Sequence, residues 1–183
     1  IYTLDNGLKI YITVNKEKPR IQTYIAVRTG SRNDPAETTG LAHYLEHIMF
    51  KGTEKFGTSN YQAELPYLKQ IENLYEEYRH MTDPAKRKVW YHKIDSVSQI
   101  AAQYNIPNEY DKLMAAIGSQ GTNAYTSNDV TCYVENIPSN EMDSWAKVQG
   151  DRFQNMVIRG FHTELEAVYE EYNMGLTSDG RKL

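Results

Sequence analysis

The hydrophobic period of this chain changes twice along the sequence, and no other feature restricts its fold as strongly. Apolar and polar residues alternate over residues 8–14, 21–27 and 130–135, which is the period of a half-buried β-strand. Residues 123–126 fit a partner strand across the turn at 127–129. Elsewhere, apolar residues recur at helical spacing, which predicts helices over about 38–50, 67–117, 139–156 and 162–176. This order predicts an α+β fold, with an antiparallel-rich sheet packed against helices.

The middle of the chain, residues 67–117, differs from the sequence on either side. Two apolar stripes at three- and four-residue spacing are separated by Asp83-Pro84, a typical helix N-cap followed by a first-turn proline. They predict an αα-hairpin, with a short third helix at about 108–117. Because the stretch is rich in Lys, Glu, Gln and Tyr, we interpret it as an insertion into the surrounding domain.

Composition excludes several classes of function. The 183 residues carry a net charge of −4 without a basic cluster, which argues against nucleic acid or an anionic membrane surface as the main partner. No apolar run approaches the roughly 20 residues of a membrane span. A single cysteine, Cys132, excludes an internal disulfide framework and a cysteine-based zinc site.

The ends of the chain indicate a piece of a longer protein. The first residue is Ile1 rather than Met, and the sequence that follows resembles folded protein rather than a signal peptide. The compartment is therefore not readable from this end. We take an extracytoplasmic location, such as the periplasm, as favoured over the cytoplasm.

The pattern His43-x-x-Glu46-His47 is the strongest chemical signal in the chain. On a helix, residues four apart lie about 40° from one another around the axis, so both imidazoles point to one side and can share a zinc ion. Glu46 lies on the same side, where it can accept a proton from a water molecule. The order is the inverse of His-Glu-x-x-His and is a known zinc-hydrolase signature. The alternative is a solvated helix face that holds an ordinary ion pair.

A catalytic zinc site needs a third protein ligand and leaves the fourth position open. Four glutamates crowd the predicted helix near the end of the chain, and two of them, Glu164 and Glu171, are seven residues apart and so share one face. One of them can ligate zinc while the other supports a ligating histidine. Spacing alone does not decide which.

These residues resemble the pitrilysin and insulin-degrading-enzyme family of zinc peptidases, which also includes the mitochondrial processing peptidases. The inverted motif and the downstream Glu-x6-Glu carry the resemblance, and it extends over nearly all of the chain outside residues 67–117. Five further segments match: Leu4-Asp5-Asn6-Gly7-Leu8, Gly40-Leu41-Ala42, Phe50-Lys51-Gly52-Thr53, Asn123-Ala124-Tyr125-Thr126 and the predicted helix from Trp145 to Phe153. The resemblance implies the LuxS/MPP-like metallopeptidase fold and identifies residues 1–183 as an incomplete N-terminal zinc-binding domain.

The resemblance also implies a role for each candidate residue. His43, His47 and Glu171 would bind Zn²⁺, and Glu46 would be the general base. Glu164 falls where the family keeps a carboxylate that supports a ligand. Asn123 and Ala124 match the edge strand on which the family binds its substrates, peptides or unfolded polypeptides, by strand addition; alternatively, Asn123 only caps a turn.

Two departures from the family pattern affect the functional prediction. The interval from His47 to Glu171 is longer than is usual, and the insertion at 67–117 accounts for the excess. The chain also stops soon after Glu171, so the similar C-terminal domain or the partner subunit that closes the family's reaction chamber is expected outside it. The sequence therefore predicts the metal-bearing part of a zinc metalloendopeptidase, which is weakly active or inactive alone. The alternatives are a non-catalytic subunit or peptide-binding module on the same fold, and a protein whose helical hairpin is the main functional surface.

Overall fold

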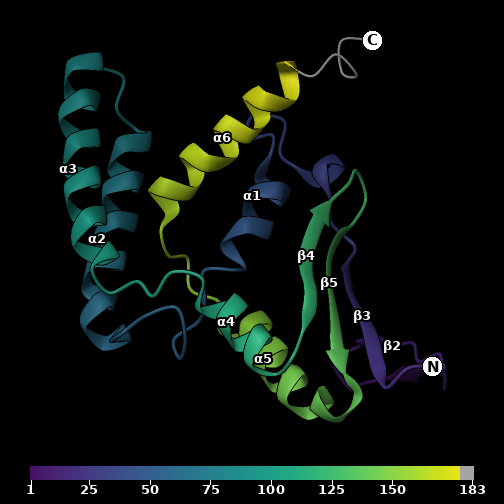
Figure 1. The fold of residues 1–183 in the computed structure, drawn as a ribbon. Coiled ribbons are helices and arrows are strands. Elements are labelled where there is room, and N and C mark those ends of the chain that lie inside the picture. Colours follow the sequence, from purple (N-terminus) through teal and green to yellow (C-terminus); the bar gives the residue numbers. More distant parts are fainter. Residues whose placement is uncertain (178–183) are drawn as a thin grey trace.

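The computed structural model describes residues 1–177 and has the predicted α+β fold, with helices packed against an antiparallel sheet (Figure 1). In chain order its elements are β1 (Tyr2–Thr3), β2 (Lys9–Ile10), β3 (Arg20–Val27), the 3-10 helix η1 (Ser31–Asn33), α1 (Leu41–Ile48), α2 (Tyr61–Arg79), α3 (Pro84–Ala102), α4 (Glu109–Ala116), β4 (Gln120–Thr126), β5 (Thr131–Pro138), the 3-10 helix η2 (Ser139–Glu141), α5 (Met142–Gln154) and α6 (Phe161–Thr177). No helix among the described residues is both long and apolar enough to cross a membrane.

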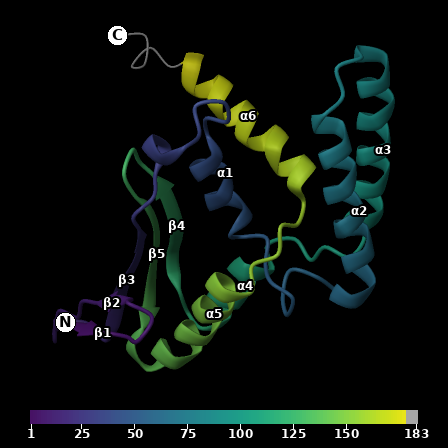
Figure 2. The same cartoon turned by 180° about the vertical axis from the view of Figure 1, so that it is seen from behind.

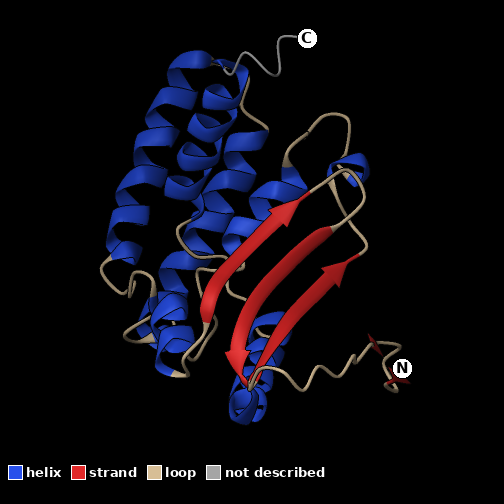
Figure 3. Cartoon of the chain, turned by 45° about the vertical axis from the view of Figure 1, so that its right-hand side comes forward, coloured by secondary structure: helices blue, strands red, loops and turns tan. Residues whose placement is uncertain are grey.

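The main sheet has three antiparallel strands in the order β3-β5-β4. Its register places Ile25 opposite Tyr133, and Tyr133 opposite Ala124. Helices cover one face of the sheet, and the opposite face is open in the described structure (Figure 3). The alternation predicted for residues 21–27 is present, since Thr23 is buried while Tyr24 is exposed.

The predicted strand over residues 8–14 is wrong in extent. Only Lys9–Ile10 forms a strand, and it pairs with β1 in a separate two-stranded sheet that lies away from the main one (Figure 3). Leu8, Ile12 and Val14 are more than half exposed. Alternation of this kind produces a strand when one face is buried, and no described element packs on this segment to bury it.

The predicted αα-hairpin is present as α2 and α3, and α2 begins earlier than expected, at Tyr61. The side chain of Asn60 caps α2, and the side chain of Asp83 accepts hydrogen bonds from the first amides of α3. A core centred on Leu74, Ile94 and Val97 joins the two helices. Helix α6 runs between this hairpin on one side and α1 with the sheet on the other (Figures 1 and 2).

Candidate metal centre

Helix α1 begins with two local features that fix its first turn. Gly40 precedes it with a φ of 94°, a left-handed conformation that glycine adopts without strain. The carboxylate of Asp34 accepts hydrogen bonds from the amides of Gly40 at 2.7 Å and of Ala42 at 2.9 Å, and its charge complements the positive end of the helix dipole. These contacts set the orientation of the helix that carries His43 and His47.

The structure brings together three potential metal ligands, His43, His47 and Glu171, although 124 residues separate the last two. The two Nε2 atoms are 3.2 Å apart, and the Oε2 atom of Glu171 lies 3.7 Å from Nε2 of His43 and 3.4 Å from Nε2 of His47. Ligand atoms about 2.1 Å from a tetrahedral zinc are about 3.4 Å from one another. The donor set and its spacing therefore fit a zinc ion.

Glu164 and Glu171 lie on the same face of α6. Glu164 contacts His47 at Nδ1, the ring nitrogen that is not the candidate ligand atom. Its Oε1 atom is 2.9 Å from Nδ1 of His47, and Lys51 forms an ion pair with its other oxygen. The hydrogen bond with Glu164 raises the pKa of His47, and the hydrogen bonds with His47 and Lys51 lower the pKa of Glu164. A carboxylate at Nδ1 favours the tautomer that leaves the Nε2 lone pair free to bind a metal.

Glu46 is on the side of α1 that faces the sheet, and its side chain is buried. The hydroxyl of Thr126, at the end of β4, donates a hydrogen bond to Oε2 of Glu46 at 2.5 Å. This bond holds one carboxylate oxygen and leaves the other oxygen available to exchange a proton. The geometry allows Glu46 to serve as a general base.

Asn123 and Ala124 lie in β4, at the outer edge of the main sheet. Each is paired with β5 on one side, opposite Val134 and Tyr133 respectively. On the other side, no described strand pairs with β4, so its backbone can accept an added strand. The same strand ends at Thr126, which connects this edge directly to Glu46.

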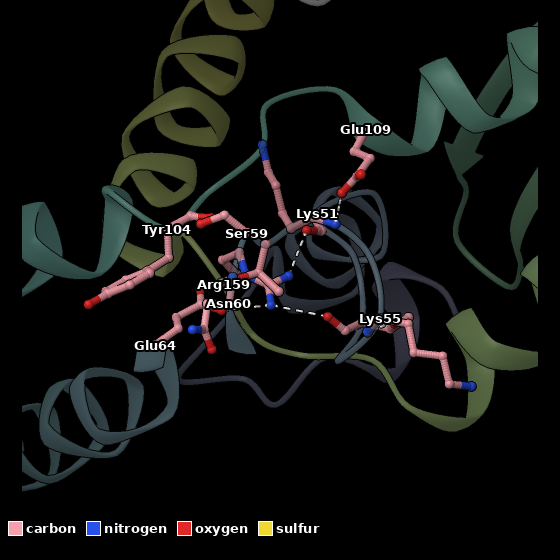
Figure 4. A network of polar contacts seen from close by, with 11 residues as sticks. Lys51, Lys55, Ser59, Asn60, Glu64, Tyr104, Glu109 and Arg159 are labelled. Carbon is pink, nitrogen blue, oxygen red and sulfur yellow. Dashed lines mark hydrogen bonds and ion pairs between the residues drawn. The ribbon is translucent and has the colours of Figure 1, made fainter. Parts of the chain in front are cut away.

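Sequence reasoning did not assign roles to several residues that support this centre. Thr126 and Lys51 stand within segments that resemble the family, but no spacing rule points to their contacts with Glu46 and Glu164. No sequence pattern pointed to Arg159, which is buried and binds several parts of the chain (Figure 4). Its guanidinium donates to both carboxylate oxygens of Glu64, at 2.6 and 2.9 Å, and to the backbone carbonyls of Lys51 and Thr53. We refer to Arg159 with its partners Glu64, Lys51 and Thr53 as the Arg159 hub.

The contacts of Arg159 connect three parts of the molecule. Glu64 belongs to the first turn of α2, the two carbonyls belong to the loop after α1, and Arg159 itself lies just before α6. A guanidinium with five donors can bridge such groups because its planar fork matches the carboxylate. The hub thus fixes the ends of the two helices that carry the candidate ligands.

Comparison with known proteins supports the resemblance seen in the sequence. Residues 10–82 match the sequence model of the insulinase family, peptidase family M16. An insulin-degrading enzyme homolog of Dictyostelium discoideum is 35% identical over 65 residues, which are 36% of this chain and 7% of that protein. YmxG of Bacillus subtilis, named as an uncharacterized zinc protease, is 38% identical over 52 residues, 28% of this chain and 13% of that protein.

The fold has a counterpart among solved structures. A protease from Helicobacter pylori superposes with a TM-score of 0.54 at 20% identity, over 84% of this chain and 26% of that protein. At this identity the likeness establishes the fold alone. In every one of these comparisons the chain spans only a small part of its relative's length.

Proposed function

Since this chain is similar to the insulinase family of peptidases, we propose that it is the metal-bearing part of a zinc metalloendopeptidase. The observation that carries the proposal is the convergence of three ligand atoms, two imidazole Nε2 atoms and one carboxylate oxygen, within 4.8 Å of one another. His43, His47 and Glu171 would hold the ion. Bound zinc would polarise the scissile carbonyl and make water a stronger nucleophile.

The chain's own residues would perform the proton chemistry. Glu46 accepts a proton from the attacking water and delivers it to the leaving amine, while the hydrogen bond from Thr126 holds one oxygen of the Glu46 carboxylate in place. Glu164 holds the ring of His47 through Nδ1 and stabilises its ligating tautomer.

The proposal extends to the substrate and to the rest of the protein. A peptide or unfolded polypeptide would add as a strand to β4 at Asn123 and Ala124, because an extended chain has free backbone groups that can pair with this edge. Residues 1–183 would form an N-terminal zinc-binding domain, with the helical hairpin at 67–117 as an insertion. A similar domain or a partner subunit would close the site.

Zinc content measured by elemental analysis tests the metal site. We expect one zinc per wild-type chain, loss of tight binding in Glu171→Gln, and full occupancy in the control Glu170→Gln, which changes the neighbouring exposed carboxylate. Unchanged zinc in Glu171→Gln would show that Glu171 is not a ligand.

Hydrolysis of an unstructured fluorogenic peptide, measured with the domain or subunit that closes the site also present, tests the role of Glu46. Glu46→Gln keeps its zinc and loses at least ~100-fold in the hydrolysis rate, since the proton acceptor is removed. Hydrolysis that persists in Glu46→Gln contradicts the general-base assignment. A wild-type chain that binds zinc and peptide but cleaves nothing, even with the domain or subunit that closes its site, favours the non-catalytic binding module.

A further inference from the structure

The first two residues of α6 lie where three other helices meet. The hydroxyl of Tyr44, on α1, donates a hydrogen bond to the backbone carbonyl of Phe161 at 2.8 Å. The ring of Phe161 packs edge-on against Tyr44 on one side and against Tyr75 of α2 on the other, with ring centroids 5.2 and 4.9 Å away. The start of α6 is therefore held between the metal-binding helix and the hairpin.

His162 makes the next contact with the hairpin, and it is a buried residue. Its Nδ1 atom is 2.9 Å from the hydroxyl of Tyr75, and its ring lies edge-on to Tyr91 of α3. Its Nε2 atom faces the carboxylates of Asp95 and Glu166, at 4.0 and 3.9 Å. The hydroxyl of Tyr75 and Nδ1 of His162 share one hydrogen bond that joins α2 to α6. Burial raises the pKa of Tyr75 to about 12, so its hydroxyl remains a donor at neutral pH.

A second contact fixes the segment just before α6. Arg159 is bound through its guanidinium to Glu64 at the base of α2, and both side chains are almost fully buried. The hairpin thus holds the chain at residue 159 by an ion pair and at residue 162 by a hydrogen bond. These two attachments to the hairpin, three residues apart, restrain the segment from which α6 leaves the junction.

That direction matters because the candidate third ligand is far from the junction. Glu171 lies nine residues after His162, which is about 13 Å along a helix. A tilt of about 5° at the start of α6 would move the backbone at Glu171 by about 1 Å. Metal–ligand distances tolerate deviations of only about 0.2 Å.

We propose that the helical hairpin is a positioning element of the zinc site, and that Tyr75, through His162, sets the direction of α6 and so the place of Glu171. The inference rests on the proposed function, since it assigns the hairpin a role in that same site. Tyr75 is a positioning residue because it touches neither ligand nor substrate. The insertion is then part of the metal site's support.

The test compares Tyr75→Phe with Tyr67→Phe in the full 183-residue chain. Tyr75→Phe removes one hydroxyl and keeps the ring that packs on Phe161. Tyr67 is two turns earlier on the same helix and stacks on Tyr104, so Tyr67→Phe makes the same chemical change away from α6. Zinc affinity is measured by competition with a chelator, and amide hydrogen exchange of residues 161–172 is measured without metal.

In Tyr75→Phe we expect exchange in α6 to accelerate and zinc affinity to fall, each by about 3- to 10-fold, as for loss of one hydrogen bond. Tyr67→Phe should leave both unchanged. Unaltered α6 exchange in Tyr75→Phe overturns the inference, as does faster exchange with unaltered zinc affinity. If the wild-type chain itself binds no zinc, the proposed function fails, and with it the ligand-positioning role, whatever the exchange data show about how the hairpin holds α6.

Discussion

The Arg159–Glu64 pair offers the clearest measurement of what holds α1 and α6, the two helices with candidate metal ligands, in place. Both side chains are almost fully buried, and Glu64 accepts two hydrogen bonds from Arg159. Glu64→Gln removes the negative charge at nearly constant volume and leaves the guanidinium buried with only carbonyl partners and one amide oxygen. Loss of one partner from a buried ion pair costs about 3–5 kcal/mol.

Because the glutamine side chain would keep one amide oxygen as a hydrogen-bond acceptor, we expect Glu64→Gln to lower the free energy of unfolding by about 3 kcal/mol, the lower end of that range. For a chain of this length, that corresponds to a fall of about 6–12 °C in melting temperature. Urea unfolding followed by circular dichroism measures the loss, with a chelator present so that bound zinc does not contribute.

Glu76→Gln is the matched control for Glu64→Gln. Glu76 is on the same helix and pairs with Arg79 at 2.6 Å, but both side chains are more than half exposed. Such a pair contributes less than about 1 kcal/mol. If Glu64→Gln lowers the free energy of unfolding no more than Glu76→Gln does, the buried hub does not secure the hairpin to the loop after α1, and its proposed role is refuted.

Two further predictions concern pH and the hairpin core. The pKa of Glu164 lies below its ordinary value of 4.5 and that of His47 lies above its ordinary value of 6.5. The stability contributed by Glu164 is lost as pH falls through its lowered pKa, and that contributed by His47 is lost as pH rises through its raised pKa. The pair should therefore stabilise the zinc-free chain most between pH 4.5 and 6.5. We expect a maximum in melting temperature over this pH range, and we expect Glu164→Gln to flatten it. The same dependence of melting temperature on pH in wild type and Glu164→Gln would contradict the pairing. Ile94→Ala, at a fully buried hairpin site, should cost about 2–5 kcal/mol in urea unfolding, and a cost below about 1 kcal/mol would mean that the hairpin core is loosely packed.

The helical elements were predictable because their signals are local. The stripes of α2 and α3, the cap at Asp83 and the motif on α1 all depend on residues within a few positions of one another. The same reasoning failed for residues 8–14. The alternation of apolar and polar residues indicates which face of a strand is apolar. Whether the segment pairs with another strand and is buried depends on segments distant in the sequence.

By itself, the sequence determined the chemistry that the chain can offer: two imidazoles and a carboxylate on one helix face, and a group of glutamates on another helix. Only the tertiary structure decided how these are combined. It places Glu171 beside both imidazoles and Glu164 behind His47, and it brings Thr126 to Glu46. The physical reason is distance along the chain, because a helix repeat fixes neighbours four residues apart, whereas contacts between residues 80 or more positions apart depend on how α6 and β4 pack against α1.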